Sequence, residues 1–257
     1  MIVKKKWFKL TAALLAAILM QSCMVPRAPE TPIATRFYSI SPNSTDHLIV
    51  LLPGRGDTVD AFDTGGFIEA MRASSIQADA LAIDAHLGYY ISGQLAERVR
   101  EDVLIPYRQA GYESFTLVGT SLGGYGSLWL YNEFGDWFQG MLLVAPYLGP
   151  RDIIDSVAES DNLSQWLQDL DHEPTEDEYA WLWLQQISES ESGLDGLLLL
   201  AFGEDDKFAK GAGIVSVLLP EKQAFRRDGS HNWNTWLELW RDVLESPAWA
   251  ELSTTAD

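Results

Sequence analysis

The stretch FTLVGTSLGGYGSLWLYNEFG, residues 115–135, changes its pattern at a single serine. An apolar run of strand character ends at Gly119, and an apolar pattern of helical period begins after Ser121. Gly123 and Gly124 follow closely, so the backbone there can bend sharply and pack tightly. The stretch therefore predicts a buried strand, a tight turn that holds the serine, and a helix.

Strands and helices alternate on both sides of this stretch. We expect further strands at 47–54, 78–85, 140–146, 194–206 and 222–229, and further helices at 65–74, 92–111 and 232–246. Apolar strands that alternate with helices predict an α/β fold, in which a mostly parallel, twisted sheet carries helices on both faces. Ligand sites in such sheets lie beyond the carboxyl ends of the strands.

Residues 151–193 interrupt the alternation, because they contain helical patterns and no predicted strand. Thr175 and Glu178 form a capping-box pair that indicates a helix start. Acidic residues share this insertion with Trp181 and Trp183, which suits a cover that is dry beneath and wet above. One interpretation is a helical lid over Ser121; the other is a fixed addition that shields an edge of the sheet.

Gly119-Thr120-Ser121-Leu122-Gly123 has the form G-x-S-x-G, in which the residues two before and two after the serine come nearly into contact. Such a turn lifts the Ser121 hydroxyl above the strand end. A serine hydroxyl is a poor nucleophile unless an acid-oriented base activates it. The backbone N–H of Leu122 would face the oxygen on which negative charge develops.

Four histidines are candidates for the base. His231, in the segment DGSHNW between the last strand and the last helix, is best placed to reach back over Ser121. His47 precedes the first core strand, and His172 lies in the insertion. His86 follows a strand but precedes the serine in the chain, so we expect it to be a pocket wall or a hydrogen-bonded polar group.

The acid is expected after the strand in LLLLAFGEDDK, residues 197–207. Asp206 stands three residues after the glycine that ends the strand, and this favours it over Asp205, which stays an alternative. A second oxyanion donor is expected from the loop after the first core strand, where the N–H of Arg55 is the candidate. The Arg55 side chain could meet the substrate or form an ion pair with a nearby aspartate.

The segments PGRG, GTSLGG, GEDD and GSHNW, in the chain order serine, aspartate, histidine, resemble the α/β-hydrolase superfamily over residues 45–246. The resemblance implies a serine hydrolase, most often of small-molecule acyl esters. An HGGG segment is absent, so the esterase subfamilies that carry it are not supported. A thioesterase, an amidase or peptidase, an acyltransferase, or an inactive binding protein on this fold stay open, whereas a dehalogenase would need aspartate in place of Ser121.

Composition excludes several other classes. The formal net charge is −19, with 37 acidic residues, which argues against nucleic acid as a partner. The histidines lack the spacing of a zinc site, and no G-x-G-x-x-G segment follows a strand, so we expect no metal and no cofactor.

The N-terminus resembles a bacterial lipoprotein signal peptide over residues 1–22. A lysine-rich start is followed by an apolar run over residues 10–20, which leads into LMQSC at residues 19–23 and ends at Cys23, the only cysteine. Cleavage there would leave 14 basic and 37 acidic residues, so the membrane contact would be through lipid on Cys23 only. Met24 in place of aspartate implies the outer membrane, facing the periplasm, while an ordinary signal peptide with an incidental cysteine is the alternative.

These patterns divide the chain into four expected parts. They are a signal peptide (1–22), an anchored linker (23–36), an α/β-hydrolase core (37–150 and 194–250) and a helical lid insertion (151–193).

Intact-mass analysis of membrane-extracted protein tests the anchor. We expect Cys23 to be the first residue and to carry acyl chains, because several chains are needed for stable attachment. Cys23→Ser should give soluble protein or an uncleaved precursor. Cleavage at another bond, with no acyl mass, would contradict the assignment.

Overall fold

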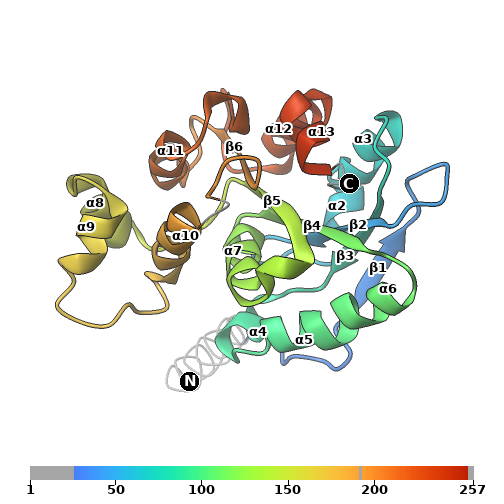
Figure 1. Cartoon of the computed structure of the whole chain (residues 1–257), viewed down its shortest axis with the longest axis horizontal. Coiled ribbons are helices and arrows are strands. Elements are labelled where there is room, and N and C mark those ends of the chain that lie inside the picture. Colours follow the sequence, from blue (N-terminus) through green and yellow to red (C-terminus); the bar gives the residue numbers. More distant parts are fainter. Residues whose placement is uncertain (1–25, 191–192, 254–257) are drawn as a thin grey trace, which may run out of the picture.

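A computed structural model describes residues 26–190 and 193–253, and in it seven strands form one sheet (Figure 1). The strand order is β1-β3-β2-β4-β5-β6-β7, and all pairs are parallel except β1 with β3. The strands are β1 Thr35–Tyr38, β2 His47–Leu52, β3 Asp79–Ile83, β4 Ser114–Thr120, β5 Phe138–Val144, β6 Leu198–Gly203 and β7 Ala224–Arg227. The mostly parallel α/β architecture predicted from the sequence is confirmed.

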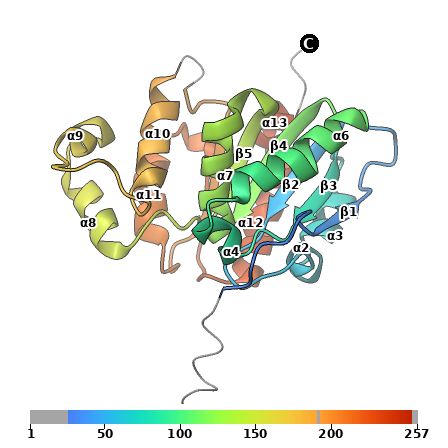
Figure 2. The ribbon, with the colours of Figure 1, turned by 90° about the horizontal axis from the view of Figure 1, so that it is seen from below.

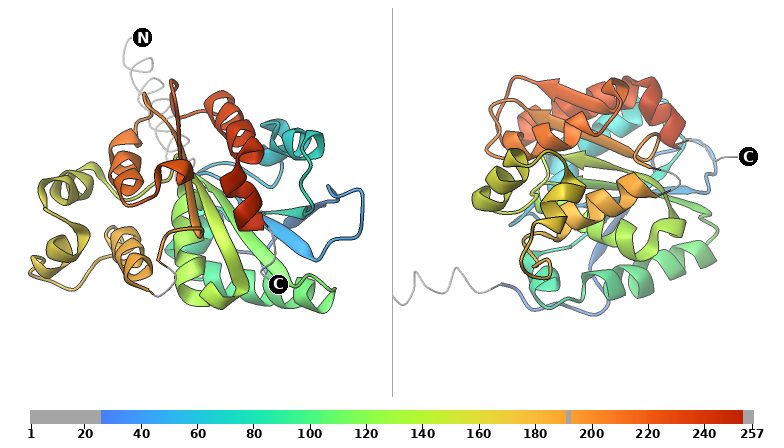
Figure 3. Two further views of the ribbon diagram at one scale, coloured as in Figure 1. Left: turned by 45° about the horizontal axis from the view of Figure 1, so that its top comes forward. Right: turned by 60° about the vertical axis from the view of Figure 1, so that its left-hand side comes forward.

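Helices cover both faces of the sheet (Figures 2 and 3). One face carries α4 Leu87–Ile91, α5 Leu95–Val99, η2 Arg100–Leu104, α6 Ile105–Gln109, α7 Leu122–Phe134 and α11 Ala209–Val217. The helices α8 Arg151–Glu159, α9 Leu163–Gln168 and α10 Tyr179–Glu189 extend the same core beyond the sheet. The other carries α2 Ala61–Thr64, α3 Phe67–Ala73, α12 Trp233–Glu245 and α13 Pro247–Ser253. Two short 3₁₀ turns, η3 Gly135–Trp137 and η4 Glu221–Gln223, precede β5 and β7.

Side chains of the buried strands alternate between two cores. In β2, Leu48, Val50 and Leu52 point into the core beneath α7, whereas Ile49 and Leu51 point into the core beneath α3 and α12. All six residues of β2 are buried, as expected for a strand that helices cover on both faces.

Several short elements were not predicted. β1, α4, α11 and α13 have between four and nine residues, too few for a clear period in the sequence. The helix expected at 92–111 begins at Leu95, includes the π-helical segment η2 and ends at Gln109. The helix expected at 65–74 is α3, and the short helix α2, which was not predicted, precedes it across Gly65 and Gly66.

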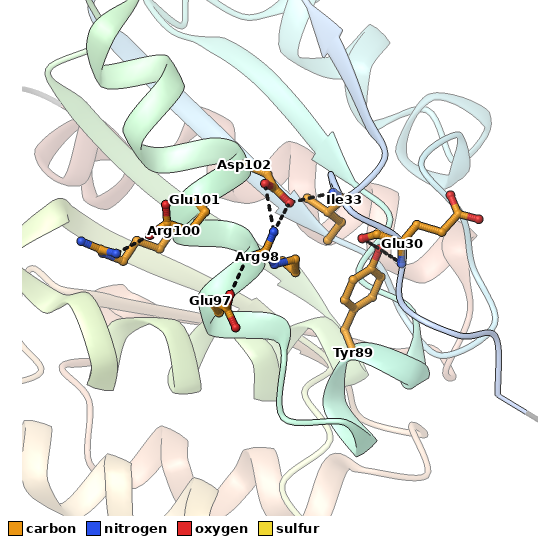
Figure 4. Close-up of polar contacts among 8 residues, drawn as sticks. All are labelled: Glu30, Ile33, Tyr89, Glu97, Arg98, Arg100, Glu101 and Asp102. Atoms are coloured by element: carbon orange, nitrogen blue, oxygen red, sulfur yellow. Dashed lines mark hydrogen bonds and ion pairs between the residues drawn. The ribbon is translucent and has the colours of Figure 1, made fainter.

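The segment before β1 lies on the domain, although its three prolines predict a linker. Arg27 forms a two-bond ion pair with Asp84 at 2.9 Å. The Glu30 backbone forms hydrogen bonds with the Tyr89 hydroxyl at 3.0 Å, and the Ile33 N–H donates to Asp102 at 2.8 Å (Figure 4). The predicted linker boundary at residue 36 also falls inside β1. Cys23 and the predicted signal peptide lie outside the described residues.

The insertion adds α8, α9 and α10 beside the sheet (Figure 1). Of these, α10 packs on α7, where Trp183 contacts Tyr125 with ring centroids 5.2 Å apart. Within residues 26–190 and 193–253, no helix has both the length and the apolar character to span a membrane.

The turn between β4 and α7 has almost no space for side chains. Ser121 has φ 51° and ψ −112°, a backbone conformation that L-residues rarely adopt. A Cβ atom at Gly119 would lie 2.1 Å from the carbonyl oxygen of Gly123, and one at Gly123 would lie 2.0 Å from that of Leu52. The two glycines therefore let β2, β4 and α7 meet.

Two alanine substitutions test this requirement. Gly119→Ala should lower the free energy of unfolding by about 3 kcal/mol, because backbone must move to admit the methyl group. Gly213→Ala is the matched control: a Cβ there meets nothing within 4 Å in the interior of α11. It should raise the free energy of unfolding by about 0.5–1 kcal/mol, since glycine is a poor helix former. Urea unfolding measures both, and a Gly119→Ala protein as stable as wild type would refute the packing argument.

Candidate active site

Ser121, His231 and Asp206 form one hydrogen-bonded chain at the carboxyl end of the sheet. The Nε2 atom of His231 lies 3.0 Å from the Oγ atom of Ser121. Its Nδ1 atom lies 2.9 and 2.8 Å from the two carboxylate oxygens of Asp206. The structure thus brings together the three side chains that sequence patterns single out from positions up to 110 residues apart.

Backbone hydrogen bonds hold Ser121 on both sides. Its N–H donates to the carbonyl of Val144 at 2.9 Å. Its carbonyl accepts from the N–H groups of Gly124 at 3.0 Å and Tyr147 at 2.9 Å. These bonds offset the strain of the positive φ and fix the direction of the hydroxyl.

Burial distinguishes Asp206 from Asp205. The Asp206 side chain is completely buried, and it also accepts a hydrogen bond from the N–H of Phe208 at 2.8 Å. Asp205 is exposed, and its backbone N–H donates to Gly229 at 3.0 Å. Only Asp206 is in contact with the histidine.

The loop that carries His231 is fixed by close packing. A Cβ at Gly203 would lie 2.2 Å from the carbonyl oxygen of Gly229, which itself has φ 143°. The loops after β6 and β7 therefore touch through two residues without side chains. The His231 ring lies edge-on to Phe208 and Trp236, each with ring centroids 4.8 Å apart.

These contacts fit one tautomer of His231. Because an ionised carboxylate only accepts hydrogen bonds, Nδ1 of His231 carries the proton toward Asp206. Nε2 is then free to accept the hydroxyl proton of Ser121. The arrangement can draw a proton from the serine as its oxygen attacks an electrophile.

Two backbone segments adjoin Ser121. Leu122 is the first residue of α7, where an N–H has no partner within the helix. Gly54, after β2, packs closely on the serine: a Cβ there would lie 3.4 Å from the Cβ atom of Ser121. Arg55 follows Gly54 in this loop and lines the pocket beside the serine.

The Arg55 side chain is exposed and lines the pocket above the serine. Within the described part of the chain it forms no ion pair with Asp57 or Asp60, and Asp60 instead pairs with Arg36 at 2.7 Å. The Arg55 side chain therefore faces the pocket and does not form the ion pair that was the alternative.

A pocket of about 900 Å³ opens beside Ser121. Most of its large lining side chains are aromatic: Tyr90, Tyr125, Trp129, Tyr147, Tyr179, Trp183 and Phe208. Charged residues also border it: Arg55, Lys207, Glu133, Glu176 and Asp177. Burial raises the pKa of Tyr90, Tyr125 and Tyr147, so these phenols stay neutral.

Most of the aromatic residues that line the pocket were not predicted from the sequence. Tyr90 lies on the short helix α4, and Phe208 precedes α11, neither of which was predicted. An i, i+4 spacing of Tyr125 and Trp129 after the serine was the one available signal. Trp183 was singled out from the sequence. It lies on α10 and lines the pocket because α10 packs on α7.

The other histidines have structural contacts. His86 is buried and accepts the N–H of Gly88 at 3.1 Å, so it caps α4. His47 contacts the hydroxyl of Thr116 at 2.9 Å. His172 faces Glu178 in the insertion at 3.2 Å. Among the residues described, no three histidines, cysteines or acids are placed to hold a metal ion.

Solved structures of esterases and related hydrolases share the fold at low identity. An S-formylglutathione hydrolase from Staphylococcus aureus is 14% identical with a TM-score of 0.59, covering 86% of this chain and 95% of its own. A Paleococcus ferrophilus monoacylglycerol lipase is 14% identical with a TM-score of 0.54, covering 86% and 99%. Est1E from Butyrivibrio proteoclasticus, solved with ferulic acid, is 13% identical with a TM-score of 0.54, covering 86% and 97%.

A search of curated proteins gave no match. The family model described as "Putative esterase" matches residues 90–243, more than half of the chain, and spans Ser121, Asp206 and His231. The fold is that of the α/β-hydrolases. The chain therefore belongs to this esterase family.

Proposed function

We propose that the protein cleaves carboxylic esters through an acyl-enzyme on Ser121, with His231 as base and Asp206 as orienting acid. The observation that carries the proposal is the unbroken hydrogen-bonded chain from the serine hydroxyl through both ring nitrogens to a buried carboxylate. Membership of the esterase family agrees with this reaction class.

The proposed reaction has two halves. Ser121 Oγ attacks the ester carbonyl carbon while its proton moves to Nε2 of His231. Collapse of the tetrahedral intermediate breaks the bond to the alcohol oxygen, which leaves with the proton from Nε2. Water then gives a proton to Nε2 and attacks the acyl-enzyme, and the proton returns to Oγ as the acid product departs. Asp206 stays ionised and stabilises the imidazolium in both halves.

The N–H groups of Leu122 and Arg55 are proposed as the oxyanion donors. Leu122 has the unpaired amide of a helix N-terminus, whose dipole favours negative charge. The support for Arg55 is that it follows Gly54, whose position packs closely on the Cβ atom of Ser121. Preorganised donors of this kind contribute about 10²–10³ each to turnover.

The pocket supports a substrate with a bulky apolar or aromatic acyl group. Trp183 stacks on Trp129 with an interplanar angle of 15°, and both line the space beside Ser121 with Tyr125. Flat aromatic surfaces favour rings and long acyl chains. One fold neighbour was solved with ferulic acid, an acid of this shape. We propose that α10 acts as the lid over the acyl group.

We also propose that Cys23 carries lipid and attaches the enzyme to the outer membrane, facing the periplasm. The support is the signal-like sequence at residues 1–22 and the lone cysteine that follows it. Under this proposal lipid supplies the only membrane contact.

Three substitutions test the assignment of the triad. Ser121→Ala should lower turnover of a short-chain ester by about 10⁴–10⁶ with little change in melting temperature. Asp206→Asn should lose about 10⁴, because the imidazole then loses its orienting partner. Asp205→Asn, exposed and out of contact with His231, should stay within about threefold of wild type. An active Ser121→Ala protein, or the opposite order of the two aspartates, would contradict the assignment.

A panel of esters with graded acyl groups tests the lid. Trp183→Ala should improve the relative kcat/KM of the ester with the bulkiest acyl group by about tenfold, because loss of the indole enlarges the pocket. Trp181 is the matched control, since it is completely buried and does not line the pocket. Trp181→Phe should lower the melting temperature and leave the order of substrates unchanged. If Trp183→Ala lowers all rates equally and in step with melting temperature, α10 is only structural.

A further inference from the structure

The segment before β1 is held directly against helix α4. Arg27 pairs with Asp84 through two bonds of 2.9 Å, just before this helix begins. Both backbone groups of Glu30 bond to the hydroxyl of Tyr89, which is buried within α4 (Figure 4). A Cβ at Gly88 would lie 1.9 Å from the Arg27 carbonyl oxygen, so the two backbones touch. The place where the chain enters the domain is therefore fixed.

This entry point limits where a lipid on Cys23 could lie. The described chain begins beside α4 (Figure 2). Only four positions separate Cys23 from Arg27 in the sequence. An extended chain advances at most about 3.5 Å per residue, so the lipid would be attached within about 14 Å of Arg27. Attachment by that lipid would bring α4 close to the membrane surface.

The same short helix forms one side of the pocket mouth. We call residues 87–93, which are α4 and the two residues after it, the α4 rim. Five of its seven residues line the pocket: Leu87, Tyr90, Ile91, Ser92 and Gly93. The contact of Gly88 with Arg27 falls within this rim. The point of attachment and the pocket mouth therefore lie within about one helical turn of each other.

The composition of the α4 rim suits a lipid surface. None of its residues is charged, although the chain has a formal net charge of −19. Ile91 is 66% exposed, and it is one of four large apolar side chains that are exposed within residues 26–190 and 193–253. Apolar groups gain free energy on leaving water, whereas a charge would have to be desolvated. The rim can thus enter the headgroup region of a bilayer at little cost.

Aromatic side chains connect the rim to the serine. The ring centroid of Tyr90 lies 6.3 Å from those of Tyr125 and Trp129. Tyr125 is on the first turn of α7, four residues after Ser121. All three rings line the pocket, so an apolar acyl chain that enters at the rim meets apolar surface on the way to the serine.

We propose that the α4 rim rests on the bilayer that holds the lipid of Cys23, so that the pocket opens onto the membrane and takes acyl esters dissolved in it. The inference rests on the proposed function and on the proposed lipid. It extends the attachment by lipid alone: the lipid holds the protein, and the rim then meets the surface. An ester delivered in this way moves from bilayer to pocket without exposing its acyl chain to water.

A quenching experiment measures the rim contact directly. The full lipidated chain is reconstituted in phosphatidylcholine vesicles that contain lipid with a spin-labelled headgroup. A fluorophore is placed on Ile91→Cys or on the control Val217→Cys, and the lipidated Cys23 leaves the new thiol as the only one. Val217 is 82% exposed and ends α11, which returns to the start of β7 at the opposite end of the parallel strands. We expect at least about threefold stronger quenching at Ile91 than at Val217.

An activity experiment measures the route of the substrate. About twelve Gly and Ser residues are inserted between Met24 and Val25, which lets the domain move about 20 Å further from its anchor. Turnover of a long-chain ester dissolved in the vesicles is divided by turnover of a short-chain p-nitrophenyl ester in water. The insertion should lower this ratio about tenfold, because the rim is no longer held at the surface. Ile91→Asp should also lower the ratio about tenfold, and Val217→Asp should leave it within about twofold.

Three results would overturn the inference: equal quenching at Ile91 and Val217, a ratio that the insertion leaves unchanged, or wild-type protein that does not bind the vesicles. Quenching needs no turnover, so it stays decisive if Ile91→Asp fails to fold. The water-soluble ester separates this inference from the proposed function. Wild type that cleaves that ester but shows equal quenching refutes the rim contact alone, whereas wild type inactive on both esters refutes the proposed function.

Discussion

The contact between the backbones of Gly119 and Gly123 is the constraint on which the site depends. It forces Ser121 into a positive φ, which costs roughly 1–3 kcal/mol for a residue other than glycine. The carbonyl of Val144 and the amide of Tyr147 hold the strained residue in place. Ala145, at the end of the next strand, also has a positive φ of 46°. Strain is thus concentrated where two neighbouring strands end, and the buried sheet beneath them supplies the stability that offsets it.

Close glycine contacts also bring the acid and base loops together. Gly203 ends β6, and Gly229 follows β7, and no side chain stands between their backbones. This approach lets His231 reach a carboxylate that is fully buried at Asp206. A buried carboxylate without partners would be costly, and here both ring and backbone donors satisfy it. The contact between His231 and Asp206 therefore depends on the close approach of two backbone segments as well as on the two side chains.

Features that depend on long apolar strands or on local motifs could be predicted from the sequence. The parallel sheet could be recognised, and Ser121, Asp206 and His231 could be singled out, because each follows a strand at a glycine-marked turn. Short elements gave no periodic signal, so α4 and its pocket residue Tyr90 were missed. The pairing of β1 with β3 depends on contacts between residues 42 to 48 positions apart, and the three prolines before β1 favoured a linker.

Helix α7 couples the chemistry to the pocket. Its first residue, Leu122, offers an amide at the serine, while Tyr125 and Trp129 line the pocket about one and two turns further on. Leu128 and Leu130 are buried in the core of the sheet, so the helix cannot rotate without breaking that core. Gly126 leaves space for the Tyr90 hydroxyl, which would lie 2.4 Å from a Cβ at that position. These aromatic rings are therefore fixed relative to Ser121 by a single rigid helix, and the insertion completes the pocket by packing α10 on the same helix. Under the proposed function, an acyl group on Ser121 would lie against these rings.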